Sequence, residues 1–245
     1  MKKLGLFTLL MLAGAAFAVI DTNPAISYST PVIYGINVPI TSNTPVNVGG
    51  QIDSFTIFPN ITTNTGLSFS HSTGVLSGTP THTDTTVYTV TAYGPGGTGD
   101  APLNVKVLNP PTDLTYSSNS AVYAINQPIP NNTPSHGGGE VISYTISQAV
   151  PTGMSFNTTT GIISGTPTVN SVPTNYLVTA INPAGTAIKT ITLTVLGPPD
   201  SLHYHVNPAS YTVGFAVTPD TPSVGGGAVS QYTVSPPLPA GLSIN

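Results

Sequence analysis

Cysteine, tryptophan and arginine are absent from the 245-residue sequence, and glutamate occurs once, as Glu140. Charged residues make up 5% of the chain, whereas they make up about a quarter of an average soluble protein. The missing basic surface argues against nucleic-acid binding. The missing Glu and Lys argue against a coiled coil, and the side chains that most catalytic schemes require are scarce. Without cysteine, each domain must be stable through its core alone.

The amino terminus has the three-part pattern of a secretory signal peptide. A basic start, Met1-Lys2-Lys3, precedes an apolar run over 4–15 and the small residues of Ala16-Phe17-Ala18. We expect residues 1–18 to be a signal peptide cleaved after Ala18, and the alternative is an N-terminal membrane anchor. No later run approaches the roughly 18 apolar residues of a membrane helix. The mature chain is therefore expected to be secreted or held at the cell surface, without a transmembrane segment of its own.

Blocks of sequence recur in the same order along the remaining chain. Tyr28, Tyr116 and Tyr204 are separated by 116 − 28 = 88 and 204 − 116 = 88 residues. Further blocks recur with a drift of one residue: Asn43-Thr-Pro45, Asn132-Thr-Pro134 and Asp220-Thr-Pro222, and Thr73–Pro80 with Thr160–Pro167. Such a period is too long for a solenoid coil and fits one independent sandwich domain.

This period predicts three tandem domains after the signal peptide: repeat 1 over 19–109, repeat 2 over 110–197 and a truncated repeat 3 over 198–245. Each joint contains paired prolines, at Pro110-Pro111 and Pro198-Pro199, so the linkers should be short and stiff. Repeat 3 lacks the blocks that complete the other two. The sequence is therefore expected to be a fragment or a prematurely ended product, and the alternative is that a partner donates the missing strands.

Within each repeat the pattern is that of β-strands. In repeat 2, Tyr176, Val178 and Ala180 alternate with Leu177 and Thr179, and apolar residues alternate with threonines over 190–195. A turn signal, Asn182-Pro-Ala-Gly185, lies between the two segments. Shorter strands are predicted over 114–117, 121–125, 141–147, 154–157 and 162–164. Gly137–Gly139 and Gly225–Gly227 are predicted to be loops. The fold class is therefore all-β, with tandem antiparallel β-sandwiches and an incomplete third copy.

Three blocks carry a family resemblance: Leu238–Leu242, Thr160–Pro167 and Tyr176–Asn182. They resemble the immunoglobulin-like repeats (He_PIG type) of bacterial surface proteins, which in turn look like bacterial cadherin-like domains. The resemblance implies tandem Ig-like sandwiches in an exported, modular protein that is not an enzyme. It also implies a role as stalk, spacer or adhesive surface.

The cadherin-like side of the resemblance implies Ca²⁺ at the domain joints, with Asp113 and Asp200 as candidate ligands. No Asp-x-Asp occurs, and the position after the Val-Thr-Ala strand holds Gly94 or Asn182, so the calcium pattern is incomplete. His203 and His205 flank Tyr204 and could bind a transition metal, although two ligands rarely suffice. The corresponding positions of the other copies hold Ser or Thr, which favours an ordinary surface pair. We therefore predict no metal and no cofactor.

Other chemistry has weaker support. Lys189, Glu140 and nearby Asn could form an isopeptide crosslink, but that reaction needs a buried Lys, Asn and acid together. Lys106 alternates with apolar residues and is expected to face outward. No catalytic triad motif, zinc-protease motif or phosphate loop is present.

The sequence therefore predicts a non-catalytic spacer or stalk of an exported bacterial cell-surface protein. Its expected partners are neighbouring Ig-like domains and, at the cell surface, a protein or polysaccharide. The alternatives are a ligand-binding adhesin that uses its loops, with or without calcium, and an accessory region of a secreted hydrolase.

Overall fold

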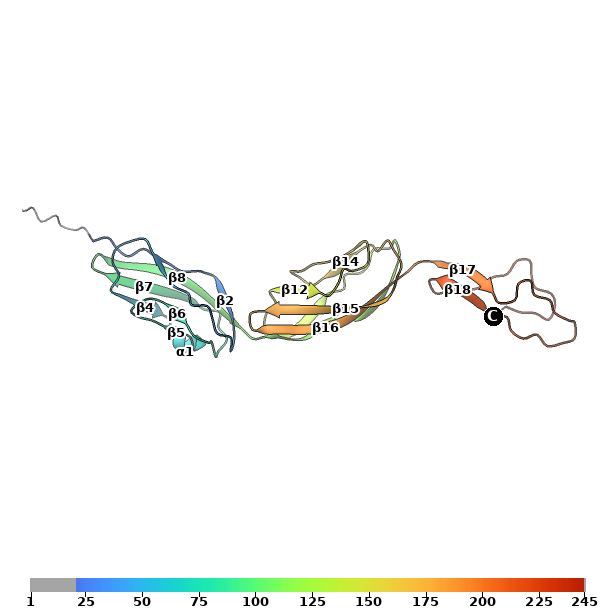
Figure 1. Cartoon of the computed structure of the whole chain (residues 1–245), viewed down its shortest axis with the longest axis horizontal. Coiled ribbons are helices and arrows are strands. Elements are labelled where there is room, and N and C mark those ends of the chain that lie inside the picture. Colours follow the sequence, from blue (N-terminus) through green and yellow to red (C-terminus); the bar gives the residue numbers. More distant parts are fainter. Residues whose placement is uncertain (1–20, 245) are drawn as a thin grey trace, which may run out of the picture. The chain divides into compact units, whose positions relative to one another are not determined.

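The computed structural model describes residues 21–244, and the predicted signal peptide with its cleavage site lies outside the described residues. The described chain divides into two compact units, one formed by 21–33 and 39–107 and the other by 34–38 and 108–244. β-strands are the main regular secondary structure of both units (Figure 1). Between residues 21 and 244, no helix is long and apolar enough to cross a membrane.

Repeat 1 contains one four-stranded sheet and two two-stranded sheets. The four-stranded sheet has the order β2 (Val32–Gly35), β8 (Gly97–Leu108), β7 (Val87–Gly94) and β4 (Ser54–Phe58). The smaller sheets pair β1 (Ile26–Ser27) with β3 (Val46–Asn47) and β5 (Ser68–Phe69) with β6 (Leu76–Ser77). A short helix, α1 (Ile61–Thr65), connects β4 to β5.

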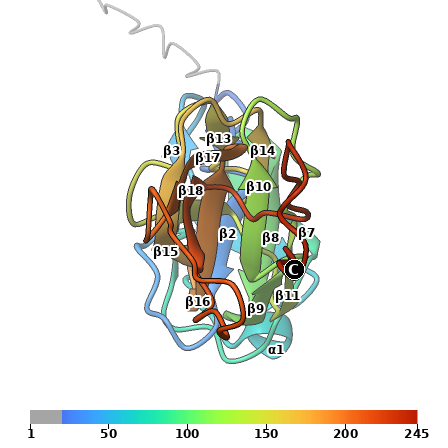
Figure 2. The same cartoon turned by 90° about the vertical axis from the view of Figure 1, so that its right-hand side faces the viewer.

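Repeat 2 has the same arrangement, so the recurring sequence blocks correspond to recurring strands. Its four-stranded sheet has the order β10 (Ser120–Ala124), β16 (Gly185–Leu196), β15 (Ser171–Asn182) and β12 (Ser143–Ile146). The smaller sheets pair β9 (Pro111–Tyr116) with β11 (Pro134–Gly138), which lie side by side in Figure 2, and β13 (Met154–Phe156) with β14 (Ile163–Gly165). Each strand that the sequence predicted in repeat 2 is confirmed, and the hairpin closes at Asn182 and Gly185 as expected.

In repeat 2, one pairing differs from the predicted antiparallel arrangement. β10 pairs with β16 in parallel, from Ser120 opposite Thr192 to Ala124 opposite Leu196. The pairs β12–β15 and β15–β16 are antiparallel. β10 follows a strand of the other sheet, and β16 is the last strand of the repeat, so no hairpin turn joins them. Strands that are not joined by a hairpin can pair in parallel.

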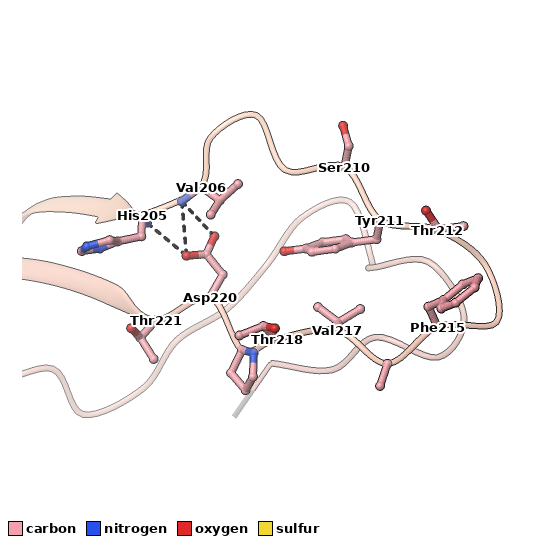
Figure 3. Close-up of a pocket in the computed structure, with 12 residues that line it drawn as sticks. His205, Val206, Ser210, Tyr211, Thr212, Phe215, Val217, Thr218, Asp220 and Thr221 are labelled. Carbon is pink, nitrogen blue, oxygen red and sulfur yellow. Dashed lines mark hydrogen bonds between the residues drawn. The ribbon is translucent and has the colours of Figure 1, made fainter.

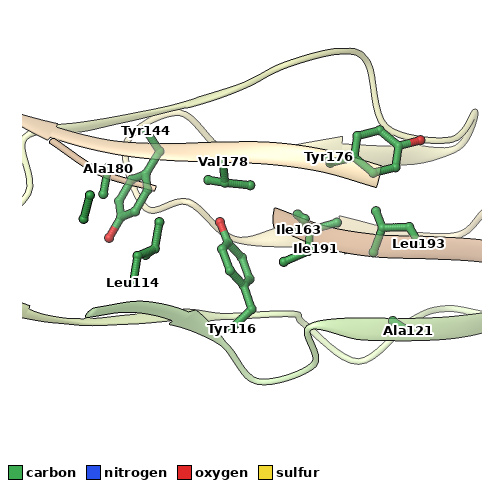
Figure 4. Packing of buried hydrophobic residues seen from close by; sticks show 11 residues of the cluster. Leu114, Tyr116, Ala121, Tyr144, Ile163, Tyr176, Val178, Ala180, Ile191 and Leu193 are labelled. Carbon is green, nitrogen blue, oxygen red and sulfur yellow. The ribbon is translucent and has the colours of Figure 1, made fainter. Parts of the chain in front are cut away.

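The core of repeat 2 lies between its sheets. Tyr116 of β9 and Tyr144 of β12 come from opposite sheets, and both side chains point into the space between them (Figure 4). Alternation along β15 and β16 places Val178 and Ile191 in this core, each fully buried. The cluster consists of Leu114, Tyr116, Ala121, Tyr144, Ile163, Tyr176, Val178, Ala180, Ala187, Ile191 and Leu193. The alternate side chains face outward, which explains why Leu177 and Ile188 are 43% and 62% exposed.

Helix α1 marks the main difference between the two repeats. Asn60 caps its amino end by accepting a hydrogen bond from the Thr63 backbone N–H, and Gly66 ends it in the left-handed conformation. The corresponding stretch of repeat 2 contains Pro151, which lacks the N–H that a helix needs at that point. It therefore forms a turn, in which Met154 N donates to the Pro151 carbonyl oxygen.

Repeat 3 contains a single pair of strands between residues 198 and 244. β17 (Pro199–Tyr204) pairs antiparallel with β18 (Pro222–Gly226), in the way that β9 pairs with β11. All six residues of β17 are exposed. The rest of this copy is irregular, with Val213 98% and Phe215 76% exposed.

Candidate functional site

The two calcium candidates, Asp113 and Asp200, occupy different positions in their repeats. Both are exposed and lie in the first strand, β9 or β17. Asp113 has a positive φ of 51° in an irregular part of β9, and its counterpart 88 residues later is Ser201, with φ of 54°. Asp200 corresponds instead to Thr112 (200 − 88 = 112). The two acids therefore do not form a repeated ligand position.

The histidine pair lies at the end of β17. His203 is opposite Ser223 in the β17–β18 ladder, and His205 follows the last residue of the strand. The contact of His205 is made by its backbone, because its N–H donates to Asp220 Oδ1 at 3.1 Å (Figure 3). In the part of the chain that the structure describes, no cluster of three or more His, Cys, Asp or Glu side chains could hold a metal ion.

The structural role of Asp220 can be inferred from the residues at the same position of repeats 1 and 2. It occupies the position of Asn43 and Asn132, which are 7% and 2% exposed. Asn132 Oδ1 accepts from Ser117 Oγ and Ser118 N, both at 2.9 Å, and its amide donates to the Ser118 carbonyl oxygen at 2.8 Å. The recurring Asn-Thr-Pro block thus marks a buried polar anchor. The sequence showed the recurrence but did not indicate this role.

A hollow of about 710 Å³ in repeat 3 includes Asp220 and His205 in its lining (Figure 3). Tyr211 and Val217 also line it, and their counterparts in repeat 2 are Tyr123 and Ile129 (211 − 88 and 217 − 88). Both counterparts pack against the core cluster of repeat 2. The hollow is therefore the uncovered core position of this copy, and it lacks the enclosed lining of a ligand pocket.

The glycine clusters are not the flexible loops that the sequence predicted. Gly137 and Gly138 belong to β11, and Gly138 is opposite Pro111 in the ladder with β9. A Cβ at Gly138 would collide with the Pro110 carbonyl oxygen, and one at Gly139 with the Asn109 carbonyl oxygen. In repeat 3, a Cβ at Gly226 or Gly227 would collide in the same way with the carbonyl oxygen of Pro198 or Gly197. These glycines allow a strand to pass close to the linker, which is a packing requirement.

The segment that leads into repeat 2 is hydrogen-bonded to a buried amide of that repeat. Asn182, 6% exposed, donates through Nδ2 to the carbonyl oxygens of Asn109 at 2.8 Å and Glu140 at 2.9 Å. Its Oδ1 accepts from the backbone N–H groups of Ala184 and Gly185. At position 182 the sequence holds Asn where a calcium site would need an acidic residue. In the structure its amide group is a hydrogen-bond donor to two backbone carbonyls that could otherwise attract a cation.

The linker itself is very short. Only Asn109 and Pro110 separate β8 from β9. The Asn109 carbonyl is bonded to Asn182, and the Pro110 carbonyl accepts from Gly139 N at 3.1 Å. Pro110 also has a fixed φ and no N–H. The linker is therefore bound along its length to the body of repeat 2.

The crosslink candidates are not assembled into a reactive group. Lys189 is half-buried opposite Val178, and Glu140 is exposed. A crosslink of this kind needs a buried Lys and a buried acid, which neither side chain provides. Lys106, which was expected to face outward, is half-buried between buried Val105 and Val107.

Comparison with known proteins agrees with this architecture. Residues 104–196, which cover repeat 2, match the family described as "Putative Ig domain". The chain thus contains tandem Ig-like β-sandwiches, a fold of structural or adhesion-type modules. The further link to cadherin-like domains is not supported by this match. Among curated protein sequences, none matches the chain.

Several solved structures resemble the chain at low similarity. The I-band fragment I67-I69 of titin is 16% identical with a TM-score of 0.39, over 73% of this chain and 65% of the fragment. Murine CEACAM1b is 14% identical with a TM-score of 0.38, over 71% of this chain and 100% of that one. The eight N-terminal Ig domains of DSCAM are 19% identical with a TM-score of 0.38, over 76% and 25%. Similarities of this size carry no inference about function.

Proposed function

We propose that the chain is a non-catalytic spacer, a stalk segment of tandem Ig-like domains in an exported bacterial cell-surface protein. The bonded two-residue joint before repeat 2 carries this proposal, because a spacer must transmit distance and a free linker would not. The amino-terminal signal pattern over 1–18 supports export. The domain limits 19–109, 110–197 and 198–245 are part of the proposal.

The surface chemistry of the repeats also supports a spacer. Outward positions of the strands are mostly Thr, Ser and Asn, such as Thr145, Asn175 and Thr190 in repeat 2, and all three are exposed. Hydroxyl and amide groups keep a surface hydrated without the charge that would attract oppositely charged partners. An extended repeat exposed to many molecules outside the cell benefits from this neutrality.

An adhesin is the second candidate, and one observation favours it. Leu177 and Ile188 are exposed on adjacent strands of the four-stranded sheet of repeat 2, two residues apart in register. The glycine clusters, which had been the expected loop contacts, lie in strands and pack against the linker. An adhesive surface would therefore use this sheet face.

One display experiment separates the two candidates. The full chain is presented on a bacterial surface with a small binding domain fused after its last residue, and capture of ligand-coated beads is counted. Deleting residues 110–197 should reduce capture, because the binding domain then reaches less far. Leu177→Thr with Ile188→Thr should leave capture unchanged.

The control is a chain without the fused domain, tested for attachment to host cells and matrix. Equal capture by the full and shortened chains would contradict the spacer. Attachment by the control chain that disappears in the Leu177→Thr, Ile188→Thr variant would support the adhesin. Export is checked separately by the mass of the mature chain, which should begin at Val19.

A further inference from the structure

We propose that the four-stranded sheet of repeat 2 binds, through its solvent side, the same side of a second copy of this chain. We call this surface the outer sheet face. It is formed by the outward residues of 175–181 in β15 and 186–192 in β16, together with Ser143 and Thr145 of β12. The inference goes beyond both candidate functions, because neither of them names a second copy as the partner.

Alternation along the strands determines which side chains belong to the outer sheet face. Val178 and Ala180 of β15 point into the core (Figure 4), so the alternate residues, such as Leu177 and Thr179, point outward. In β16, buried Ile191 likewise lies between outward residues. The face therefore belongs to regular, paired strands, which hold its side chains at fixed positions.

The outer sheet face carries no charge. Lys189 is the only charged residue within 143–145, 175–181 and 186–192, and it lies opposite buried Val178, on the core side. In repeat 1 the position of Ile188 holds Asp100 (188 − 88 = 100), which is exposed opposite Thr91. The uncharged face is thus particular to repeat 2. Because the chain has a net charge of −4, two copies can approach through this face without like charges meeting.

Large and small side chains alternate across the outer sheet face. Each of three successive pairs between β15 and β16 joins one aliphatic residue to one threonine. The aliphatic residue lies in β15 in the first pair, in β16 in the second and in β15 in the third. The pairs are Ile181 with Thr186, Thr179 with Ile188, and Leu177 with Thr190.

This alternation makes the face complementary to itself. A two-fold axis parallel to the strands and midway between β15 and β16 would place β15 of one copy over β16 of the other. Leu177 of one copy then faces Thr190 of the second copy, and Ile188 faces Thr179. Each large side chain meets a small one, as close packing between two sheets requires. A second copy is therefore the occupant that the pattern fits.

The size of the face predicts a weak dimer. Seven residues along β15 and four strands across correspond to about 20 Å by 20 Å, or about 400 Å² per copy. The total of about 800 Å² is less than the roughly 1,200 Å² of a stable interface. We therefore expect a Kd of about 0.1–1 mM in solution.

Sedimentation equilibrium of the purified full chain tests this association. Leu177→Thr with Ile188→Thr should raise the Kd at least about tenfold, because two aliphatic side chains per copy lose their contacts. The matched control is Val87→Thr, which changes an aliphatic residue of repeat 1 that is 60% exposed and should leave the Kd unchanged. Circular dichroism checks that each variant is folded.

Size variants test the geometry of the pairing. Thr190→Leu alone sets two leucines against each other across the axis, so it should weaken association although it adds apolar surface. Leu177→Thr alone leaves two threonines facing and should also weaken it. The two substitutions together again place one large and one small side chain at each contact. The Kd of this double variant should return to within about threefold of the unchanged chain.

A chain that stays monomeric at about 1 mM would overturn the proposal. So would tighter association of the Thr190→Leu variant, because it would show unspecific adhesion of apolar surface. Attachment of a monomeric chain to host cells or matrix that disappears in the Leu177→Thr, Ile188→Thr variant would assign the face to a different partner. Sedimentation of the purified chain does not depend on its reach, so these outcomes are distinguishable from failure of the spacer in the display experiment.

Discussion

The phenol hydroxyl of Tyr116 donates a hydrogen bond of 2.7 Å to the carbonyl oxygen of Gly161. The same bond joins Tyr28 to Gly74 in repeat 1, at 2.6 Å. It connects the end of β9 in repeat 2, and the residue that follows β1 in repeat 1, to the turn of the Thr-Gly block. Two motifs that recur through the sequence are therefore partners in one buried interaction.

Replacing Tyr116 by Phe should destabilise repeat 2 by about 1–3 kcal/mol, because the buried Gly161 carbonyl loses its donor. Urea unfolding followed by circular dichroism measures this loss. The matched control is Tyr204→Phe, at the same position of repeat 3, where the side chain is 36% exposed. The role of the Tyr116 hydroxyl is refuted if both variants unfold at the same urea concentration as the unchanged chain.

Alkaline pH should unfold the repeats. Burial, and then a hydrogen bond to Asp84, raise the pKa of Tyr88 to about 12, and burial raises the pKa of Tyr28 and Tyr116 further. Unfolded tyrosine titrates near pH 10. The stability gained by keeping these phenols neutral is thus complete below pH 10 and is lost as the pH rises through their folded pKa values.

Tyrosinate absorbance and circular dichroism, measured in one titration, test this expectation. The buried tyrosines should ionise together with unfolding, above pH 10. If all 11 tyrosines ionised near pH 10 while the β-sheet signal persisted, the burial of Tyr28, Tyr88 and Tyr116 would be contradicted.

The packing role of the glycine clusters predicts a large effect at Gly138. An alanine there must adopt a φ of 70° and also meet the Pro110 carbonyl. Gly214 has a φ of 85° but nothing within 4 Å of its Cβ position. Gly214→Ala should therefore cost at most about 1–2 kcal/mol for the left-handed backbone, and Gly138→Ala more. Equal melting temperatures for the two variants would restore the flexible-loop interpretation.

Because the amide of Asn132 is buried and hydrogen-bonded, replacing Asn132 should destabilise the protein more than replacing the adjacent Asn131. Asn132→Ala removes the partners of Ser117 and Ser118 and should cost about 1–3 kcal/mol in the free energy of unfolding. Asn131→Ala, at the exposed neighbouring position, should be almost neutral. Denaturant unfolding of the two variants gives the comparison, and similar losses would argue that Asn132 is not an anchor.

Alternation along the chain was sufficient to predict the long strands. Val178 and Ile191 are apolar at every second position and lie in the core, and the turn at Asn182–Gly185 has the residues that turns require. The period of 88 residues, visible in Tyr28, Tyr116 and Tyr204, indicated repeated sandwiches. The alternation is a local pattern and the 88-residue period is a repeat, so both can be read from a single sequence.

Other features depend on contacts between distant residues, which a local pattern does not encode. β11 was missed because its glycines lack the side chains by which strands are recognised, and their role comes from the linker carbonyl of Pro110. The parallel direction of β10 depends on β16, about 70 residues later. Asn182 was predicted to lie in a turn and noted as a position without an acid, but the hydrogen bonds that its amide donates to the Asn109 and Glu140 carbonyl oxygens were not predicted.

In the proposed function the repeats form a stiff spacer because the linker is bonded to repeat 2, and a distance distribution between the repeats tests this proposal most directly. Spin labels at Thr89→Cys and Thr145→Cys, which are exposed positions in repeats 1 and 2, report on the joint by pulsed electron paramagnetic resonance. We predict a narrow distribution for the labelled chain and a clearly broader one when Asn182→Ala is added. An equally broad distribution with and without Asn182 would contradict the claim.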